Sequence, residues 1–383
     1  MPMDILNNKK KLYRILALII ICVAILALVK NNAFLYSKPV ATITQATDRK
    51  EKTSTGFDGK REYKEEYYFQ DITARIDNGT NKGEKVRLKN TYGKSQVYDT
   101  KYRKGDQVFI ESLKAHENGN FTAVITGTKR DFYVALALML MVALFLIIGE
   151  KEGVMTLASL AINLVFFWFV LILYFKGYNI LLMCIPMAVI FTALLLVFMY
   201  GKNQKTALAF VSSMISLAIT TVITALVMHF SGNIDYDFMD YLIQPYDQTD
   251  ANYIFLSEVL ICSMGAIMDV VITIVATVDE IVRLRSGDFS SKEILSTSRK
   301  VGDEIVGTMI SIMFFTNIAA GLPFALLSMR NGIALTTVMR YNSFFEIARF
   351  LIGSIGTVLA IPVSAVVCIL WYKHMEERGG SKC

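Results

Sequence analysis

Long apolar segments recur along this chain, and they constrain its fold more than any other feature. Runs of roughly 18 or more apolar residues can each cross a hydrocarbon core about 30 Å thick, because an α-helix rises about 1.5 Å per residue. We therefore predict an α-helical polytopic membrane protein with about eight transmembrane helices. The predicted spans are residues 15–29, 132–148, 154–175, 180–200, 206–230, 253–282, 302–329 and 346–373.

One polar segment, residues 36–131, interrupts this pattern after the first span. It contains short strand-like stretches separated by turn signals such as Asp77-Asn78-Gly79. So many short strands in so small a segment predict a closed β barrel, for which the OB type is our choice. A role as spacer or partner-docking domain is favoured over a ligand site. The predicted strands are residues 40–47, 66–76, 85–89, 107–113 and 122–126.

The expected domain organisation follows from these two patterns. Residues 1–35 form a signal-anchor helix, 36–131 the extracytoplasmic β domain, and 132–373 a seven-helix membrane domain. A cytoplasmic loop is expected at 283–301, with a short amphipathic surface helix within it, and a cytoplasmic tail at 374–383.

The distribution of charge predicts the orientation in the membrane. Basic residues precede the first span and cluster at 283–300, whereas the loop 231–252 holds five aspartates and no Lys or Arg. Because basic loops stay on the cytoplasmic side, both termini are expected inside and residues 36–131 outside. The net charge of +6 fits this orientation, so nucleic acid is not an expected partner.

The sequence favours no enzyme chemistry. The chain has five cysteines, none of them in the polar domain, and no CxxC or Cys/His spacing, so neither a metal nor another cofactor is expected. It also lacks HExxH, GxSxG and a GxxxxGK[ST] phosphate loop. Any pumping would therefore depend on an ion gradient or on another protein.

The most informative charge is Asp269, which lies near the middle of the span 253–282. An Asp at that depth costs at least about 2.5–3.5 kcal/mol and should face protein or water. A low-dielectric environment disfavours the ionised carboxyl, which makes this residue a candidate proton carrier. Glu258 and Glu280 lie about three turns on either side, with Thr273 on the same face. This stripe predicts a proton or cation path; the alternative is close packing through its small residues.

Two further groups are candidates for the same site. Asn317 in the next span reaches a similar depth and is predicted to hydrogen bond Asp269. In the last span, Glu346 and Arg349 are three residues apart and can form an ion pair.

Three segments resemble the YibE/F family of bacterial membrane proteins: GAIMDVVITIVATVDEI (265–281), KVGDEIVGTMISIMFFTNIAAGLP (300–323) and FEIARFLIGSIGTVLAIPVSA (345–365). The resemblance extends to the β-rich region after the first helix and implies a permease of the bacterial cytoplasmic membrane. Members of that family often occur as adjacent related genes, which implies a second copy or a paralogous subunit as partner.

A more local resemblance links Gly265, Met268, Asp269, Glu280 and Arg283 to SecD/SecF and resistance-nodulation-division transporters. It implies that an intramembrane Asp on an outside-to-inside helix responds to proton or sodium flow. The chain departs from those proteins in having one such Asp, about two additional helices and a different outer domain.

These expectations lead to one hypothesis and one alternative. The hypothesis is an ion-gradient-coupled transporter or export facilitator for an unknown small-molecule or envelope substrate, with Asp269 as its coupling carboxyl. The alternative is a non-transporting membrane scaffold or receptor whose outer domain docks a partner.

Overall fold

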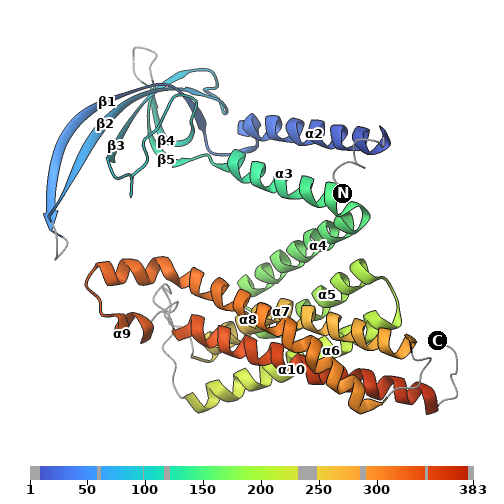
Figure 1. Cartoon of the computed structure of the whole chain (residues 1–383). Helices are drawn as coiled ribbons and strands as arrows, with labels where there is room; N and C mark the ends of the chain where they lie inside the picture. Colours follow the sequence, from blue (N-terminus) through green and yellow to red (C-terminus); the bar gives the residue numbers. More distant parts are fainter. Residues whose placement is uncertain are drawn as a thin grey trace. The chain divides into compact units, whose positions relative to one another are not determined.

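The chain forms two compact units, Met1–Val154 and Met155–Cys383 (Figure 1). The computed structural model describes residues 9–57, 62–97, 99–115, 121–231, 248–284, 290–340 and 344–377. The outer loop predicted at 231–252 lies largely outside these residues.

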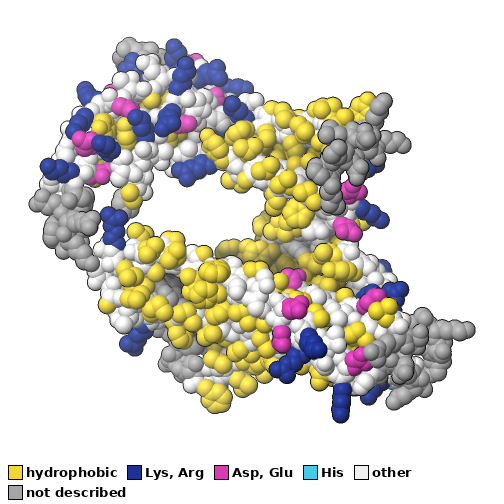
Figure 2. Space-filling model, in the orientation of Figure 1, with side chains coloured by type: hydrophobic (Ala, Val, Ile, Leu, Met, Phe, Trp, Pro, Cys, Tyr) yellow, Lys and Arg dark blue, Asp and Glu magenta, His cyan; other side chains and the backbone are white. Residues whose placement is uncertain are grey.

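Eight helices within the described ranges are long and apolar enough to cross a membrane, which confirms the multi-pass membrane prediction. Apolar side chains cover the surface of these helices, whereas Lys, Arg, Asp and Glu are interspersed over the polar domain (Figure 2). The eight are α2 (Lys9–Lys30), α3 (Asp131–Ile148), α4 (Glu150–Phe175), α5 (Ile180–Tyr200), α6 (Gln204–Ser231), α7 (Gln248–Leu284), α8 (Ser291–Arg330) and α10 (Phe344–Glu377). Two short helices, η1 (Asn32–Leu35) and α9 (Leu335–Val338), complete the helical elements described.

Helix α8 differs from the sequence prediction, because it is one helix of 40 residues. The predicted surface helix near its start is continuous with the seventh span, so the predicted loop 283–301 is shorter. Ile294, Ser298 and Gly302 are buried at intervals of four residues, which keeps one face of the helix packed across the expected boundary. At Gly302 a Cβ would collide with the side chain of Ile361 in α10, so the glycine allows close helix packing.

The polar domain is a closed barrel with strand order β1-β2-β3-β5-β4. Strands β3 and β5 are parallel, and the other neighbours are antiparallel. All five predicted strands are confirmed, and alternate residues fill the interior, for example Ile72, Ala74 and Ile76. The strands are β1 (Val40–Phe57), β2 (Glu62–Ile76), β3 (Lys85–Gly93), β4 (Gln107–Ala115) and β5 (Phe121–Thr128).

Strands β1 and β2 are longer than predicted, and they pair with each other as far as Phe57 and Glu62. The sequence does not predict the β1 extension, because the side chains of residues 48–55 are all polar and exposed, so no alternation of apolar residues marks it as a strand.

The barrel is fastened to α2 and α3 by buried polar contacts. The Lys129 side chain is only 1% exposed and forms an ion pair with Asp131 at 3.2 Å. Its Nζ also donates to the backbone oxygen of Val29 at the end of α2 (3.2 Å). Tyr36 and Asn32 donate to the second Asp131 oxygen, each at 2.9 Å. Helix α3 therefore belongs to one unit with α2 and the barrel, rather than to a single seven-helix domain.

The barrel should lose stability in acid through Asp48. Burial alone would raise the pKa of Asp48, but hydrogen bonds from Lys101, Gln70 and Tyr92 outweigh it and hold the pKa below its ordinary value of 3.8. Such a group stabilises the fold above its ordinary pKa, and the contribution is lost as the pH falls through the folded value. Lys50 and Lys94 likewise lower the pKa of Glu66 to about 2.

We expect hydrogen exchange in β1 and β2, corrected for intrinsic rates, to accelerate between pH 4.5 and about 2. Asp48→Asn should be destabilised by roughly 2 kcal/mol at pH 7 and should show a weaker pH response. An identical pH response in the wild type and Asp48→Asn would contradict this assignment.

Candidate functional site

Helix α7 is the central helix of the membrane unit, and its two faces differ. One face packs against α5, α6 and α10 and buries Ile267, Val271 and Ile274 in the core. The opposite face is exposed within this chain. It carries the small and acidic residues of the predicted stripe: Cys262, Gly265, Asp269, Ala276 and Glu280.

Asp269 lies in the middle of this exposed face. Among the residues that the structure describes, its carboxylate has no hydrogen-bond or ion-pair partner. The predicted site residue Thr273 is partly buried and donates to the backbone oxygen of Asp269 at 2.9 Å. A carboxylate at this depth is costly when it faces lipid, so the stripe requires a cover of protein or water.

The structure places Asn317 away from Asp269. Its amide donates to the backbone oxygen of Met313 (2.7 Å), and its side chain contacts Cys262. Because Cys262 precedes Asp269 by seven residues, the amide is displaced by about 10 Å along α7. The predicted Asp269–Asn317 hydrogen bond is therefore not formed. The antiparallel register of α7 and α8 could not be read from depth alone.

Near the start of α7, three charged side chains form a network with α10. Arg349 pairs with Glu346 at 2.7 Å, which confirms the predicted ion pair. Arg349 also pairs with Glu258. The Glu258 carboxylate is therefore bound to α10. Arg349 and Glu346 are 17% and 16% exposed, whereas Glu258 is 42% exposed. We refer to these three residues as the Arg349 network.

Near the end of α7, the acidic residue engaged by the bundle is Asp279 rather than the predicted Glu280. Asp279 pairs with Lys205 of α6 at 2.7 Å and accepts a hydrogen bond from Tyr372 of α10 at 2.8 Å. Glu280 is exposed. Asp279 follows Val271 and Val275 at intervals of eight and four residues, so it lies on the buried face of the helix. That spacing could have identified it from the sequence. We refer to Asp279, Lys205 and Tyr372 as the Asp279 network.

The three acidic positions of α7 are spaced across the membrane. Glu258 and Asp279 lie eleven and ten residues from Asp269, so the two networks are separated by about 30 Å, the thickness of a hydrocarbon core. Each network connects α7 with α10, and the Asp269 carboxyl between them has no partner among the described residues. No group of three or more metal-ligating side chains lies together in the described part of the chain. The candidate site therefore consists of one carboxyl, that of Asp269, between the Arg349 network and the Asp279 network.

Comparison with known families divides the chain in two parts. The family model described as YibE/F family N-terminal domain matches residues 34–128, which contain the barrel. The model described as YibE/F-like protein matches residues 137–374, which contain α7, α8 and α10. No match was found among curated proteins or solved structures.

Proposed function

Because the chain belongs to the YibE/F-like family, whose matched region contains Asp269 and both ionic networks, we propose that it is an ion-gradient-coupled membrane transporter or export facilitator. The observation that carries this proposal is the position of Asp269: mid-membrane, unpaired among the described residues, and on the small-residue face of α7. Asp269 is the coupling carboxyl, and its ion is a proton or sodium.

The coupling follows from the cost of charge in hydrocarbon. With a bound proton or sodium ion on Asp269, the middle of the α7 stripe is neutral and can lie against apolar surroundings. When the ion leaves, the carboxylate must reach water or a polar partner, because an ionised Asp in lipid costs several kcal/mol. Loading and unloading therefore favour different positions of α7. The Arg349 and Asp279 networks hold α7 against α10 at both ends, so the two helices move together.

A second subunit completes this site. Helix α8 also exposes a polar strip, Gly307, Thr308 and Ser311, within its membrane span. A homodimer or a paralogous partner that covers this strip and the α7 stripe would remove both from lipid, through the close packing that small residues allow. We place the protein in the bacterial cytoplasmic membrane, with both termini inside and an OB-type barrel outside.

The proposal is tested by ion flux in proteoliposomes. The purified chain is reconstituted around a lumenal pH dye or, in a separate preparation, a lumenal sodium dye, and an inward gradient of the corresponding ion is imposed. We expect faster dissipation than in protein-free liposomes for one of the two ions. Leak rates equal to those of protein-free liposomes under both gradients would contradict a transporter.

The alternative function is a membrane scaffold, and the polar β1–β2 extension beyond the barrel favours it as a docking element. Deletion of residues 40–128 separates the two functions. We expect the deletion variant to retain ion flux within about threefold of the wild type, because the coupling site lies in the other unit. A variant that elutes as a monodisperse species in detergent but has lost all flux would show that the barrel is indispensable. A wild type without flux, whose cellular role disappears on this deletion, would support the scaffold.

A further inference from the structure

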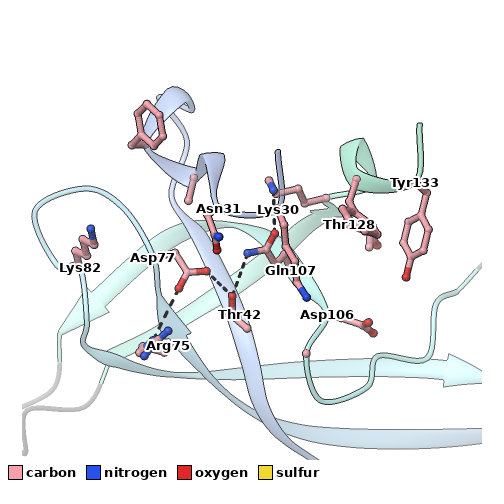
Figure 3. A pocket seen from close by; sticks show the side chains of 15 residues that line it. Lys30, Asn31, Thr42, Arg75, Asp77, Lys82, Asp106, Gln107, Thr128 and Tyr133 are labelled. Atoms are coloured by element: carbon pink, nitrogen blue, oxygen red, sulfur yellow. Dashed lines mark hydrogen bonds and ion pairs between the residues drawn. The ribbon is translucent and has the colours of Figure 1, made fainter. Parts of the chain in front are cut away.

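A pocket of about 550 Å³ lies where the base of the barrel meets the ends of α2 and α3 (Figure 3). This volume is within the range of small-ligand sites in proteins, about 300–1,000 Å³. All of its lining residues belong to the first compact unit, and none belongs to the ion-coupling site.

The pocket lies at the level of lipid headgroups. Its lining includes Lys30, the last residue of α2, and Tyr133 in the first turn of α3. Because both helices are membrane spans, these ends mark the boundary of the hydrocarbon. Large apolar side chains are exposed beside it: Phe34 is 73% exposed, Leu35 70% and Tyr133 68%. Aromatic residues at such a boundary are typical of the membrane interface.

The floor of the pocket is a connected polar chain. Lys129 donates to Gln107 at 2.9 Å, and Gln107 donates to Thr42 at 3.3 Å. Thr42 donates to Asp77, which also faces Arg75 at 3.9 Å. Figure 3 shows these links crossing the pocket. The carboxylate and the buried lysine on the floor therefore already have partners, and the floor is held in one arrangement.

The rim, in contrast, offers free positive charge. Four cationic and two acidic side chains line the pocket, which gives a net charge of +2. Lys30 and Lys82 are exposed, and neither has an ion-pair partner within the described residues. Asp106, the other acidic residue, accepts a hydrogen bond from the backbone N–H of Arg103 at 2.7 Å. The charged side chains that remain available to a ligand, Lys30 and Lys82, are therefore positive.

We propose that this pocket binds the phosphate of an anionic phospholipid headgroup from the leaflet next to the barrel. Lys30 and Lys82 contact the phosphate, while Phe34 and Tyr133 lie beside the upper part of the acyl chains. The lipid supports the junction at which the barrel is fastened to its two helices. This site is separate from the proposed transport function and does not depend on it.

The test is native mass spectrometry of the full chain in detergent, titrated with phosphatidylglycerol. The double variant Lys30→Gln/Lys82→Gln should bind the lipid at least about tenfold more weakly than the wild type. The matched control is Lys64→Gln/Lys89→Gln, which removes the same charge from two exposed lysines on β2 and β3 outside the pocket. This control should keep the wild-type affinity.

The proposal would be overturned by unchanged affinity in the pocket variant, by an equal loss in the control variant, or by equally tight binding of zwitterionic phosphatidylcholine. Inorganic phosphate at the lipid concentration serves as a competitor. We expect it to leave phosphatidylglycerol bound, and full displacement would identify free phosphate rather than lipid as the ligand.

Discussion

We expect the replacement of Asp269 by Asn to reduce ion-dependent flux in proteoliposomes to the level of protein-free liposomes, and the replacement by Ala to have the same effect. Asn preserves the size and polarity of the side chain but cannot take up and release a proton or balance the charge of sodium. The expected loss is therefore one of coupling rather than of folding. We measure it as the rate of gradient dissipation, with both variants reconstituted at the same protein-to-lipid ratio.

The matched control is Glu280→Gln on the same face of α7. Glu280 is exposed and lies eleven residues from Asp269, near the end of the helix. We expect this variant to keep most of the wild-type flux. Unchanged flux in both Asp269 variants at normal expression would remove this carboxyl from the mechanism, and an equal loss in Glu280→Gln would indicate a general sensitivity of the stripe to charge.

Arg349→Leu should destabilise the membrane unit by about 3–5 kcal/mol. Arg349 pairs with Glu346 and Glu258, and its removal takes the neutralising cation away from Glu346, which is only 16% exposed. Loss of one member of such a network costs far more than loss of an exposed ion pair, which is worth about 0–1 kcal/mol. The measurement is thermal unfolding of the purified chain in detergent, followed by the fluorescence of Trp168 and Trp371.

Two variants test whether the loss of stability in Arg349→Leu comes from the Arg349 network or from the removal of any arginine. Arg330→Leu removes an exposed arginine from the last turn of α8 and should unfold close to the wild type. The triple variant Arg349→Leu/Glu346→Leu/Glu258→Leu should recover most of the stability, because no charge is left unpaired. If Arg349→Leu unfolds at the same temperature as Arg330→Leu, the network does not stabilise the protein.

The elements of this fold could be predicted from the sequence because each has a strong local signal. The predicted span 180–200 has the observed ends of helix α5 (Ile180–Tyr200), where the structure shows Asn179 as an N-cap whose side chain accepts from two backbone N–H groups and Gly201 directly after the helix. The strands of the barrel were found by their alternation and by turns such as Asp77-Asn78-Gly79.

The contacts between elements could not be predicted in the same way. The pairing of Glu258 with Arg349 requires the knowledge that α7 and α10 are neighbours, which a single sequence does not contain. Asn317 is predicted at the depth of Asp269, but its side chain lies next to Cys262, about 10 Å away along α7. Side-chain partners depend on helix register to within a turn, and hydropathy fixes helix ends only to within a few residues.

The length of α8 has a consequence for how force would travel through the protein. Its 40 residues measure about 60 Å, roughly twice the thickness of the hydrocarbon layer. The helix is not interrupted near residue 302, where the sequence predicts the boundary of the membrane span. Because the helix is continuous, a displacement of its first turns is expected to be transmitted along its axis toward the turns around Asn317.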